Sequence, residues 1–253
     1  MTVVDLGFAP GSWSQVAIQA TRPNGRVVGV DILPCRPPRG MSSIQGNFLS
    51  KAVQDELKIM LSDPKSGRPI LGKHAFLDEQ KNKESVDEIP ENDSYVNLER
   101  AITTDHNNNT KIKDLGSSVQ NHHFSVDIVL SDMCEIWPQT SGFWLRTIND
   151  PYIRMMNTSG NSLRDHAYSI DLCDAALMFA LDTLKQNGKF VCKFYTGAED
   201  RFLENRLKRA FKSVKREKPN ATRSESREMY FVATGRNIQV TRQSVFGLSK
   251  GEK

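Results

Sequence analysis

Short apolar runs alternate with longer amphipathic segments along most of the chain. The apolar runs predict strands at residues 2–6, 26–31, 42–46, 125–131, 189–194 and 229–233. The amphipathic segments predict helices at residues 12–20, 48–61, 163–184 and 201–211. Because strands and helices alternate, we predict an α/β fold with a mostly parallel sheet and helices on both of its faces.

One long polar segment interrupts this pattern. Residues 62–124 are rich in Asn, Asp, Glu, Lys and Ser and have no sustained periodicity. We expect a long polar insertion there, largely disordered, between the two parts of one domain at residues 1–61 and 125–236, with a tail at 237–253. We expect His122 and His123 to be exposed rather than bound to a metal, because no partner ligands accompany them.

Composition narrows the class of protein. No run of about 18 apolar residues occurs, which predicts no membrane-spanning helix. The four cysteines lie far apart, without a CxxC pair or zinc-ligand spacing, which is typical of a reduced compartment. The net charge of +4 is uneven, since residues 201–227 hold ten Lys and Arg against three Glu. That excess fits a phosphate polymer, and from charge alone it fits a solvated helix face equally well.

The first strand ends in a glycine turn that opens a helix, in the stretch VVDLGFAPGSWSQVA at residues 3–17. Such a turn lets the backbone approach a ligand, and the helix start offers free N–H groups. The turn lacks the G-x-G-x-x-G pattern, which argues against a nicotinamide-dependent enzyme. Asp31 closes the second strand, where a carboxylate suits a ribose diol. Together these features indicate a nucleoside cofactor without a diphosphate, and S-adenosylmethionine fits.

Five motifs occur in order: D-L-G-x-A-P-G-x-W-S-Q from Asp5, V-D-I-L-P from Val30, S-D-M from Ser131, K-F-Y-x-G from Lys193 and S-R-E-x-Y-x-V-A-T-G from Ser226. This set resembles the RrmJ/FtsJ family of RNA ribose 2′-O-methyltransferases. The wording of the first two motifs is most similar to the fungal mitochondrial branch, which methylates a uridine of large-subunit ribosomal RNA. The resemblance implies a Rossmann-like S-adenosylmethionine-dependent methyltransferase fold.

The resemblance also implies a set of cofactor-binding residues: Gly7, Pro10, Gly11, Trp13, Asp31, Asn47 and Asp132. In that set, Gly11 and Trp13 would line the methionine end. Asp31 would hold the ribose hydroxyls, Asn47 would contact adenine, and Asp132 would lie beside the sulfonium. Asn47 stands where many relatives have Asp, and an amide can still hydrogen-bond an adenine edge.

The implied catalytic residues are Lys193, Asp132 and Glu228. A ribose 2′-hydroxyl is a weak acid, so it must be aligned and relieved of its proton before it attacks a methyl group. A lysine can take that proton only in its neutral form, which burial or a neighbouring cation favours. Lys193 ends an otherwise apolar strand, as a buried lysine would. The resemblance gives Lys193 the role of general base and Glu228 the role of orienting it.

Two further features stay open at this point. Trp137, Phe143 and Trp144 follow the S-D-M motif and either stack on an unpaired base or pack their loop down. The family also carries a catalytic lysine in a segment like S-R-A-x-x-K-L upstream of the first strand, and this chain begins inside that strand. We expect this chain to be a shortened version, impaired relative to a complete relative.

We therefore expect an enzyme that methylates mitochondrial large-subunit ribosomal RNA, alone or in an assembling subunit, and a basic helix at residues 201–218 that contacts RNA. We expect a monomer, located in mitochondria. The alternatives are a tRNA or cytosolic rRNA methyltransferase of the same family, or a non-catalytic ribosome-assembly factor that keeps the fold.

Overall fold

The computed structural model describes residues 1–64, 68, 124–135, 158–159, 161–224 and 226–247. These residues belong to one compact unit formed by residues 1–69 and 122–253. Its strands are β1 (Thr2–Leu6), β2 (Arg26–Asp31), β3 (Ser42–Gln45), β4 (Val126–Ser131), β5 (Leu184–Tyr195), β6 (Phe211–Glu217) and β7 (Glu228–Arg236). Its helices are α1 (Ser12–Thr21), α2 (Lys51–Ser62), α5 (Ser162–Thr183), α6 (Asp200–Ala210) and α7 (Arg242–Phe246).

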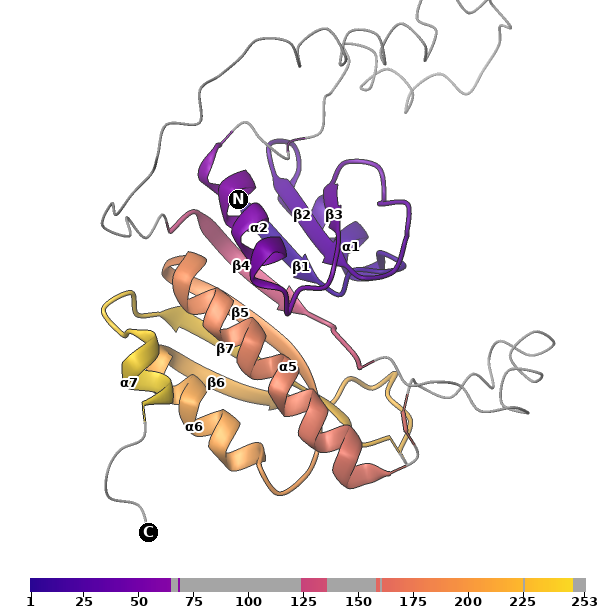
Figure 1. The fold of residues 1–253 in the computed structure, drawn as a ribbon, viewed down its shortest axis with the longest axis vertical. Coiled ribbons are helices and arrows are strands. Elements are labelled where there is room, and N and C mark those ends of the chain that lie inside the picture. Colours follow the sequence, from indigo (N-terminus) through magenta and orange to yellow (C-terminus); the bar gives the residue numbers. More distant parts are fainter. Residues whose placement is uncertain (65–67, 69–123, 136–157, 160, 225, 248–253) are drawn as a thin grey trace, which may run out of the picture. The chain divides into compact units, whose positions relative to one another are not determined.

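All seven described strands form one sheet in the order β3-β2-β1-β4-β5-β7-β6 (Figure 1). Strands β3, β2, β1, β4 and β5 run parallel, and β7 pairs antiparallel with both β5 and β6. The chain order reverses between β1 and β4, which are neighbours. In open sheets of this kind, ligands bind beyond the carboxyl ends of the strands at that reversal.

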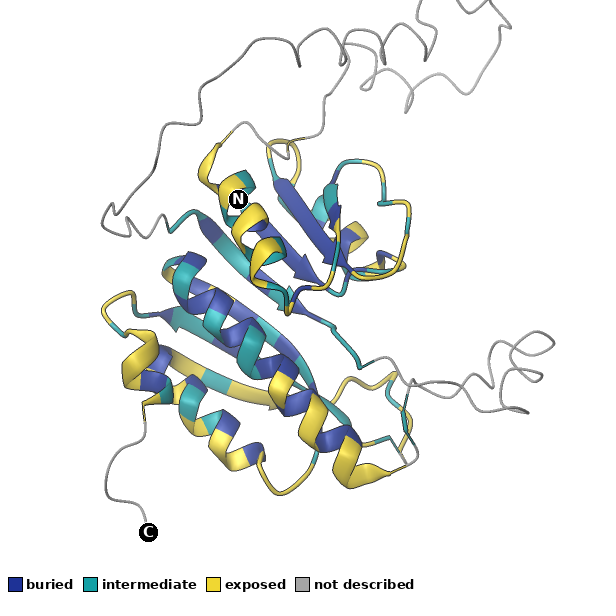
Figure 2. Ribbon diagram, in the orientation of Figure 1, coloured by how far each residue is buried: buried dark blue, intermediate teal, exposed yellow. Residues whose placement is uncertain are grey.

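Two apolar cores cover opposite faces of the sheet, because β1 alternates its side chains between them. Val4 and Leu6 belong to the larger core, which also holds side chains of α2, α5, α6 and α7. Val3 belongs to the smaller core, together with Ala17 of α1. Figure 2 shows the central strands as buried and the outer faces of the helices as exposed. The predicted α/β sheet with helices on both faces is confirmed.

The basic segment does not form one helix, and in this the prediction for residues 201–218 was wrong. Helix α6 ends at Ala210, and the chain continues as the edge strand β6. Phe211 is buried and packs on Phe190 of β5, with ring centroids 6.2 Å apart. Phe211 and Val214 are three residues apart, a spacing that fits a helix as well as an edge strand. Pairing with β7 decides between the two.

The last described residues also pack on the sheet unit. Helix α7 places the side chain of Val245 in the larger core, and the Arg206 guanidinium lies 5.5 Å from the centre of the Phe246 ring. The polar segment and its two histidines, expected at residues 62–124, lie mostly outside the described residues, as do Trp137, Phe143 and Trp144. None of the described helices combines the length and apolar character that crossing a membrane requires.

Candidate active site

Glycine backbone shapes the turn between β1 and α1. Gly7 has φ of 77°, and a Cβ there would lie 2.8 Å from the Cα of Met133, so the turn closes directly against the segment after β4. Gly11 has φ of 111°, and a Cβ there would lie 2.5 Å from Pro38 Cγ. Any other residue at these two positions meets both backbone strain and a close contact.

A cavity of about 260 Å³ lies at the carboxyl ends of β1, β2 and β4. Gly7, Asp31, Asn47 and Asp132 line it, together with apolar side chains that include Phe48. Asp31 accepts the backbone N–H groups of Ala9 and Leu33, each at 2.8 Å and each on a different carboxylate oxygen. The carboxylate is therefore fixed in place, and each oxygen keeps a further lone pair for a ligand hydroxyl.

Asn47 has one half of its side chain committed to the protein. Its Oδ1 accepts the backbone N–H of Leu49 at 2.9 Å, which fixes the amide orientation. The NH₂ half can therefore donate to an acceptor such as a ring nitrogen. The exposed apolar side chains of Ile32, Leu33 and Leu49 stand at the same cavity and offer contact to a planar ring.

Asp5 is a fully buried carboxyl beneath the turn. Its Oδ2 accepts the Ser14 hydroxyl at 2.5 Å, while Oδ1 has no hydrogen-bond partner among the described residues. Burial raises the pKa of Asp5 to about 6, and the nearby Asp132 and Asp31 add to the rise while the Ser14 hydrogen bond opposes it. The bond to Ser14 ties the first turn of α1 to β1.

Strand register brings Lys193 to Asp132. Ser131 of β4 pairs with Cys192 of β5, so the next residue along each strand lies at the same level. The Lys193 ammonium lies 2.9 Å from Oδ1 of Asp132 and donates to the Asp132 backbone carbonyl at 3.0 Å. Burial raises the pKa of Asp132, and Lys193 opposes that rise. The lysine side chain is only 11% exposed, as its apolar strand predicts.

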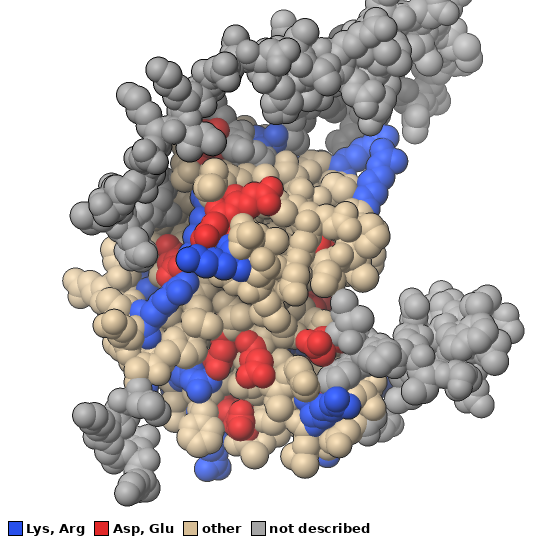
Figure 3. Space-filling view, viewed as in Figure 1, with Lys and Arg blue, Asp and Glu red and all other residues tan. Residues whose placement is uncertain are grey.

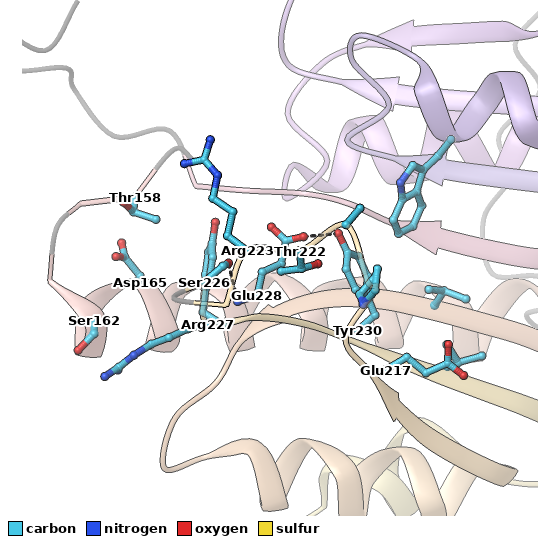
Figure 4. Close-up of a pocket in the computed structure, with 16 residues that line it drawn as sticks. Thr158, Ser162, Asp165, Glu217, Thr222, Arg223, Ser226, Arg227, Glu228 and Tyr230 are labelled. Carbon is cyan, nitrogen blue, oxygen red and sulfur yellow. Dashed lines mark hydrogen bonds between the residues drawn. The ribbon is translucent and has the colours of Figure 1, made fainter. Parts of the chain in front are cut away.

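A larger cavity of about 940 Å³ is lined in part by residues of β5 and β7, and Figure 4 shows its lining. Glu228, Tyr230 and Val232 line it because alternate residues of β7 face the same way. The Tyr230 hydroxyl donates to Glu228 at 2.6 Å. Burial and then this hydrogen bond raise the pKa of Tyr230 above its ordinary value, so the phenol keeps its proton. The Trp13 ring lies 5.5 Å from the Tyr230 ring.

Tyr195 connects the two cavities. It lines the larger one, and its hydroxyl lies 3.7 Å from the Cys134 sulfur, which lines the smaller one. Val191, Lys193 and Tyr195 share one face of β5 because they are two residues apart. Val191 and Tyr195 line the larger cavity and Asp132 lines the smaller one, whereas Lys193 is not among the lining residues of either.

The structure brings together most of the predicted site residues, in two groups. Gly7, Asp31, Asn47 and Asp132 meet at the smaller cavity, whereas Trp13 and Glu228 line the larger one. Pro10 and Gly11 form the turn before α1 and are not among the lining residues of either cavity.

The hydrogen bonds found for Lys193 and Glu228 go to different partners. Lys193 bonds Asp132, and Glu228 bonds Tyr230. Sequence reasoning missed Tyr230 and Tyr195 as site residues. Strand alternation could have found them, since each lies two residues beyond a predicted site residue.

The basic segment carries less free charge than its composition indicates. Arg206 pairs with Asp174, Lys208 with Glu204, and Arg216 with both Glu204 and Asp200. In the view of Figure 3, acidic and basic side chains intermingle over α5 and α6, with no patch of a single sign. We conclude that the ion pairs of Arg206 and Lys208 make α6 less basic than its sequence indicates.

The sheet order, the glycine turn and the carboxylate-lined cavity at the strand ends define a Rossmann-like methyltransferase. The model of the FtsJ-like methyltransferase family matches residues 1–236. The chain belongs to this family, which confirms the resemblance seen in the five motifs.

The similar proteins point in the same direction. The chain is 40% identical over 253 residues to "rRNA methyltransferase 2, mitochondrial" of Saccharomyces cerevisiae, covering 98% of this chain and 77% of that protein. It is 32% identical to the protein of the same name from Schizosaccharomyces pombe, over 92% and 76% of the two chains. It is 29% identical to "Ribosomal RNA large subunit methyltransferase E" of Thiobacillus denitrificans, over 92% and 69%.

Proposed function

We propose that this chain methylates the 2′-hydroxyl of a ribose in ribosomal RNA, with S-adenosylmethionine as the methyl donor. The observation that carries the proposal is the Lys193–Asp132 ion pair, whose acid lines the smaller cavity and whose lysine lies on β5 between Val191 and Tyr195 of the larger cavity. The names of the most similar relatives support a mitochondrial large-subunit RNA as substrate and mitochondria as the location. The resemblance supports a uridine as the target.

The smaller cavity fits the cofactor. Asp31 has lone pairs for a ribose diol, the Asn47 amide can donate to adenine, and Gly7 lets the turn close against Met133 at the cavity. Asp132 supplies negative charge where a sulfonium would need it. When bound, S-adenosylmethionine supplies an electrophilic methyl group. Pro10, Gly11 and Trp13 belong to this proposal as the residues that shape the turn.

The larger cavity fits the acceptor nucleotide. In our proposal, neutral Lys193 accepts the proton of the 2′-hydroxyl as the oxygen attacks, and the Asp132 carboxylate stabilises the resulting ammonium. Glu228 and Tyr230 line this cavity, and because the phenol donates its one hydrogen to Glu228, the phenol oxygen and the second carboxylate oxygen would accept from the ribose. Proton removal by a positioned base typically contributes 10²- to 10⁴-fold to a rate.

The test compares two lysines of the same strand. We expect Lys193→Met to lower methyl transfer from tritiated S-adenosylmethionine to ribosomal RNA by at least about 100-fold, while the Kd for the cofactor changes little. Lys189→Met, at an exposed position of β5, is the matched control and should retain full transfer. Undiminished transfer by Lys193→Met would exclude this residue as the base. If the wild-type chain and the control both bind the cofactor and neither transfers a methyl group, the result would favour a ribosome-assembly factor.

A further inference from the structure

Residues 218–224, 226 and 227, here termed the β6–β7 loop, lie between the edge strand β6 and the site strand β7. It forms one wall of the larger cavity. The described loop residues that line the cavity are Pro219, Ala221, Thr222, Arg223, Ser226 and Arg227. The loop leads directly into Glu228, so its conformation bears on the position of that carboxylate.

Lys218 holds this loop together. Its ammonium donates to the backbone carbonyls of Ser224 at 3.1 Å and Ser226 at 3.0 Å. The residue is exposed, and its ammonium group nevertheless points to the backbone of the loop and not into solvent. An ammonium that satisfies two carbonyls is a structural clamp, and those two donors are engaged within the protein.

Backbone hydrogen bonds add to the clamp. One turn closes from Thr222 N–H to the Pro219 carbonyl at 2.9 Å. At the far end, the Thr196 N–H donates to the Arg227 carbonyl at 2.9 Å, which joins the loop to the segment just after β5. The loop is therefore fixed to the residue that directly follows β5, the strand that carries Lys193.

Arg223 and Arg227 extend from this loop at the cavity, as Figure 4 shows. Both residues are exposed, and their guanidinium groups point in different directions in that view. Two diverging guanidiniums suit two phosphates along one strand better than a single anion. Arginine is also the side chain best matched to phosphate geometry.

We propose that the β6–β7 loop is the RNA-docking wall of the site, an inference that rests on the function proposed above. Arg223 and Arg227 bind phosphates of single-stranded RNA on either side of the target nucleotide, which enters the larger cavity. Lys218 acts as a positioning residue that keeps the loop in shape and does not contact RNA. Arg206 and Lys208 of α6, which are paired with Asp174 and Glu204, contribute little.

The first experiment measures binding of a short, uridine-containing single-stranded RNA by fluorescence anisotropy over a series of salt concentrations. Arg223→Gln and Arg227→Gln should each weaken binding several-fold and reduce the slope of log K against log salt by about 0.7. Arg201→Gln, an exposed basic position of α6, is the control and should leave affinity and slope unchanged. Equal losses at all three positions would overturn the assignment of the loop.

The second experiment separates the clamp from a phosphate contact. We expect Lys218→Met to raise the KM for RNA several-fold with the salt slope unchanged, and Lys218→Arg to restore it because arginine keeps donors for the carbonyls. Lys215→Met removes the same charge from an exposed position of β6 and should change neither quantity. A reduced slope in Lys218→Met would show a direct phosphate contact and contradict the clamp.

The wild-type chain is assayed for methyl transfer to RNA in the same preparations, with cofactor affinity as the measure of intact folding. Suppose that the wild-type chain transfers methyl groups and both arginine variants bind RNA normally. That result would overturn the loop assignment, and the proposed function would still hold. Absent transfer would overturn the proposed function, and RNA affinities of the variants would still decide whether the loop binds RNA.

Discussion

Asp5 places an ionisable group on a strand position from which water is excluded. Its pKa, raised to about 6 chiefly by burial, means that the folded state binds a proton more tightly than the unfolded state does. The stabilisation that comes from this proton is present below the ordinary aspartate pKa and is lost as pH rises through about 6. The Asp5 side chain therefore stabilises the fold less at neutral pH, where it is ionised, than at pH 5, where it is mostly protonated.

We predict that lowering pH from 7 to 5 stabilises the wild-type chain by about 1 kcal/mol more than Asp5→Asn. The variant keeps the shape of the side chain and lacks the titrating group, so other groups cancel in the comparison. Urea unfolding of both proteins at the two pH values measures the difference. A difference that stays constant between pH 7 and 5 would contradict the raised pKa.

Gly11 and Gly40 both have φ near 100°, with values of 111° and 100°, yet they differ in what surrounds them. A Cβ at Gly11 would lie 2.5 Å from Pro38, whereas one at Gly40 would lie 3.3 Å from Ile18. We predict that Gly11→Ala destabilises the fold by about 1–3 kcal/mol, and Gly40→Ala by clearly less. Urea unfolding checks the order, and equal losses would mean that backbone strain alone sets the effect.

Several site residues could be predicted from sequence because their roles depend on strand ends. Asp31 and Asp132 each follow an apolar run, and parallel strands bring such positions to one edge. The partners could not be predicted in the same way. The bond from Tyr230 to Glu228 and the loop contacts of Lys218 depend on side-chain geometry that motif spacing does not specify.

At the scale of elements, helix α5 begins with a side-chain N-cap. Its N-cap residue Asn161 accepts the backbone N–H groups of Leu163 and Arg164 at 3.1 and 3.3 Å. Ser50, the N-cap residue of α2, makes no side-chain cap bond. The two helices therefore provide an internal comparison of the value of a cap.

We predict that Asn161→Ala lowers the free energy of unfolding by about 1 kcal/mol, because two N–H groups lose their acceptor. Ser50→Ala should change it by only a few tenths of that amount, since the side chain accepts no cap bond. Chemical denaturation of the two variants beside the wild-type chain measures both effects. A larger loss in Ser50→Ala than in Asn161→Ala would contradict the cap assignment.

The bounds of most elements follow the pattern of apolar residues closely, and β6 marks where that pattern fails. An edge strand has one paired side and one solvated side, so its sequence need not alternate clearly. The segment Phe211–Glu217 carries three charged residues in its last three positions, which fit a helix surface equally well. Only its pairing with β7 distinguishes the two, and that pairing is between distant parts of the sequence.

At the scale of the whole molecule, the site results from strand order. Strand β4 lies between β1 and β5, so the turn after β1, the acid after β4 and the lysine of β5 meet at one edge. The five motifs identified these residues in the sequence, but they did not predict the distances between their side chains. In our proposal, the smaller cavity holds the methyl donor and the larger cavity holds the acceptor.

The central claim is that the acceptor is a ribose 2′-hydroxyl, and the position of the transferred label tests it most directly. Ribosomal RNA is labelled by the wild-type chain with tritiated S-adenosylmethionine and then hydrolysed completely in alkali. A 2′-O-methyl group blocks cleavage of the adjacent phosphodiester, so we predict that the label appears in alkali-resistant dinucleotides and is absent from RNA treated with Lys193→Met. Label recovered in mononucleotides would place the methyl group on a base and contradict the account.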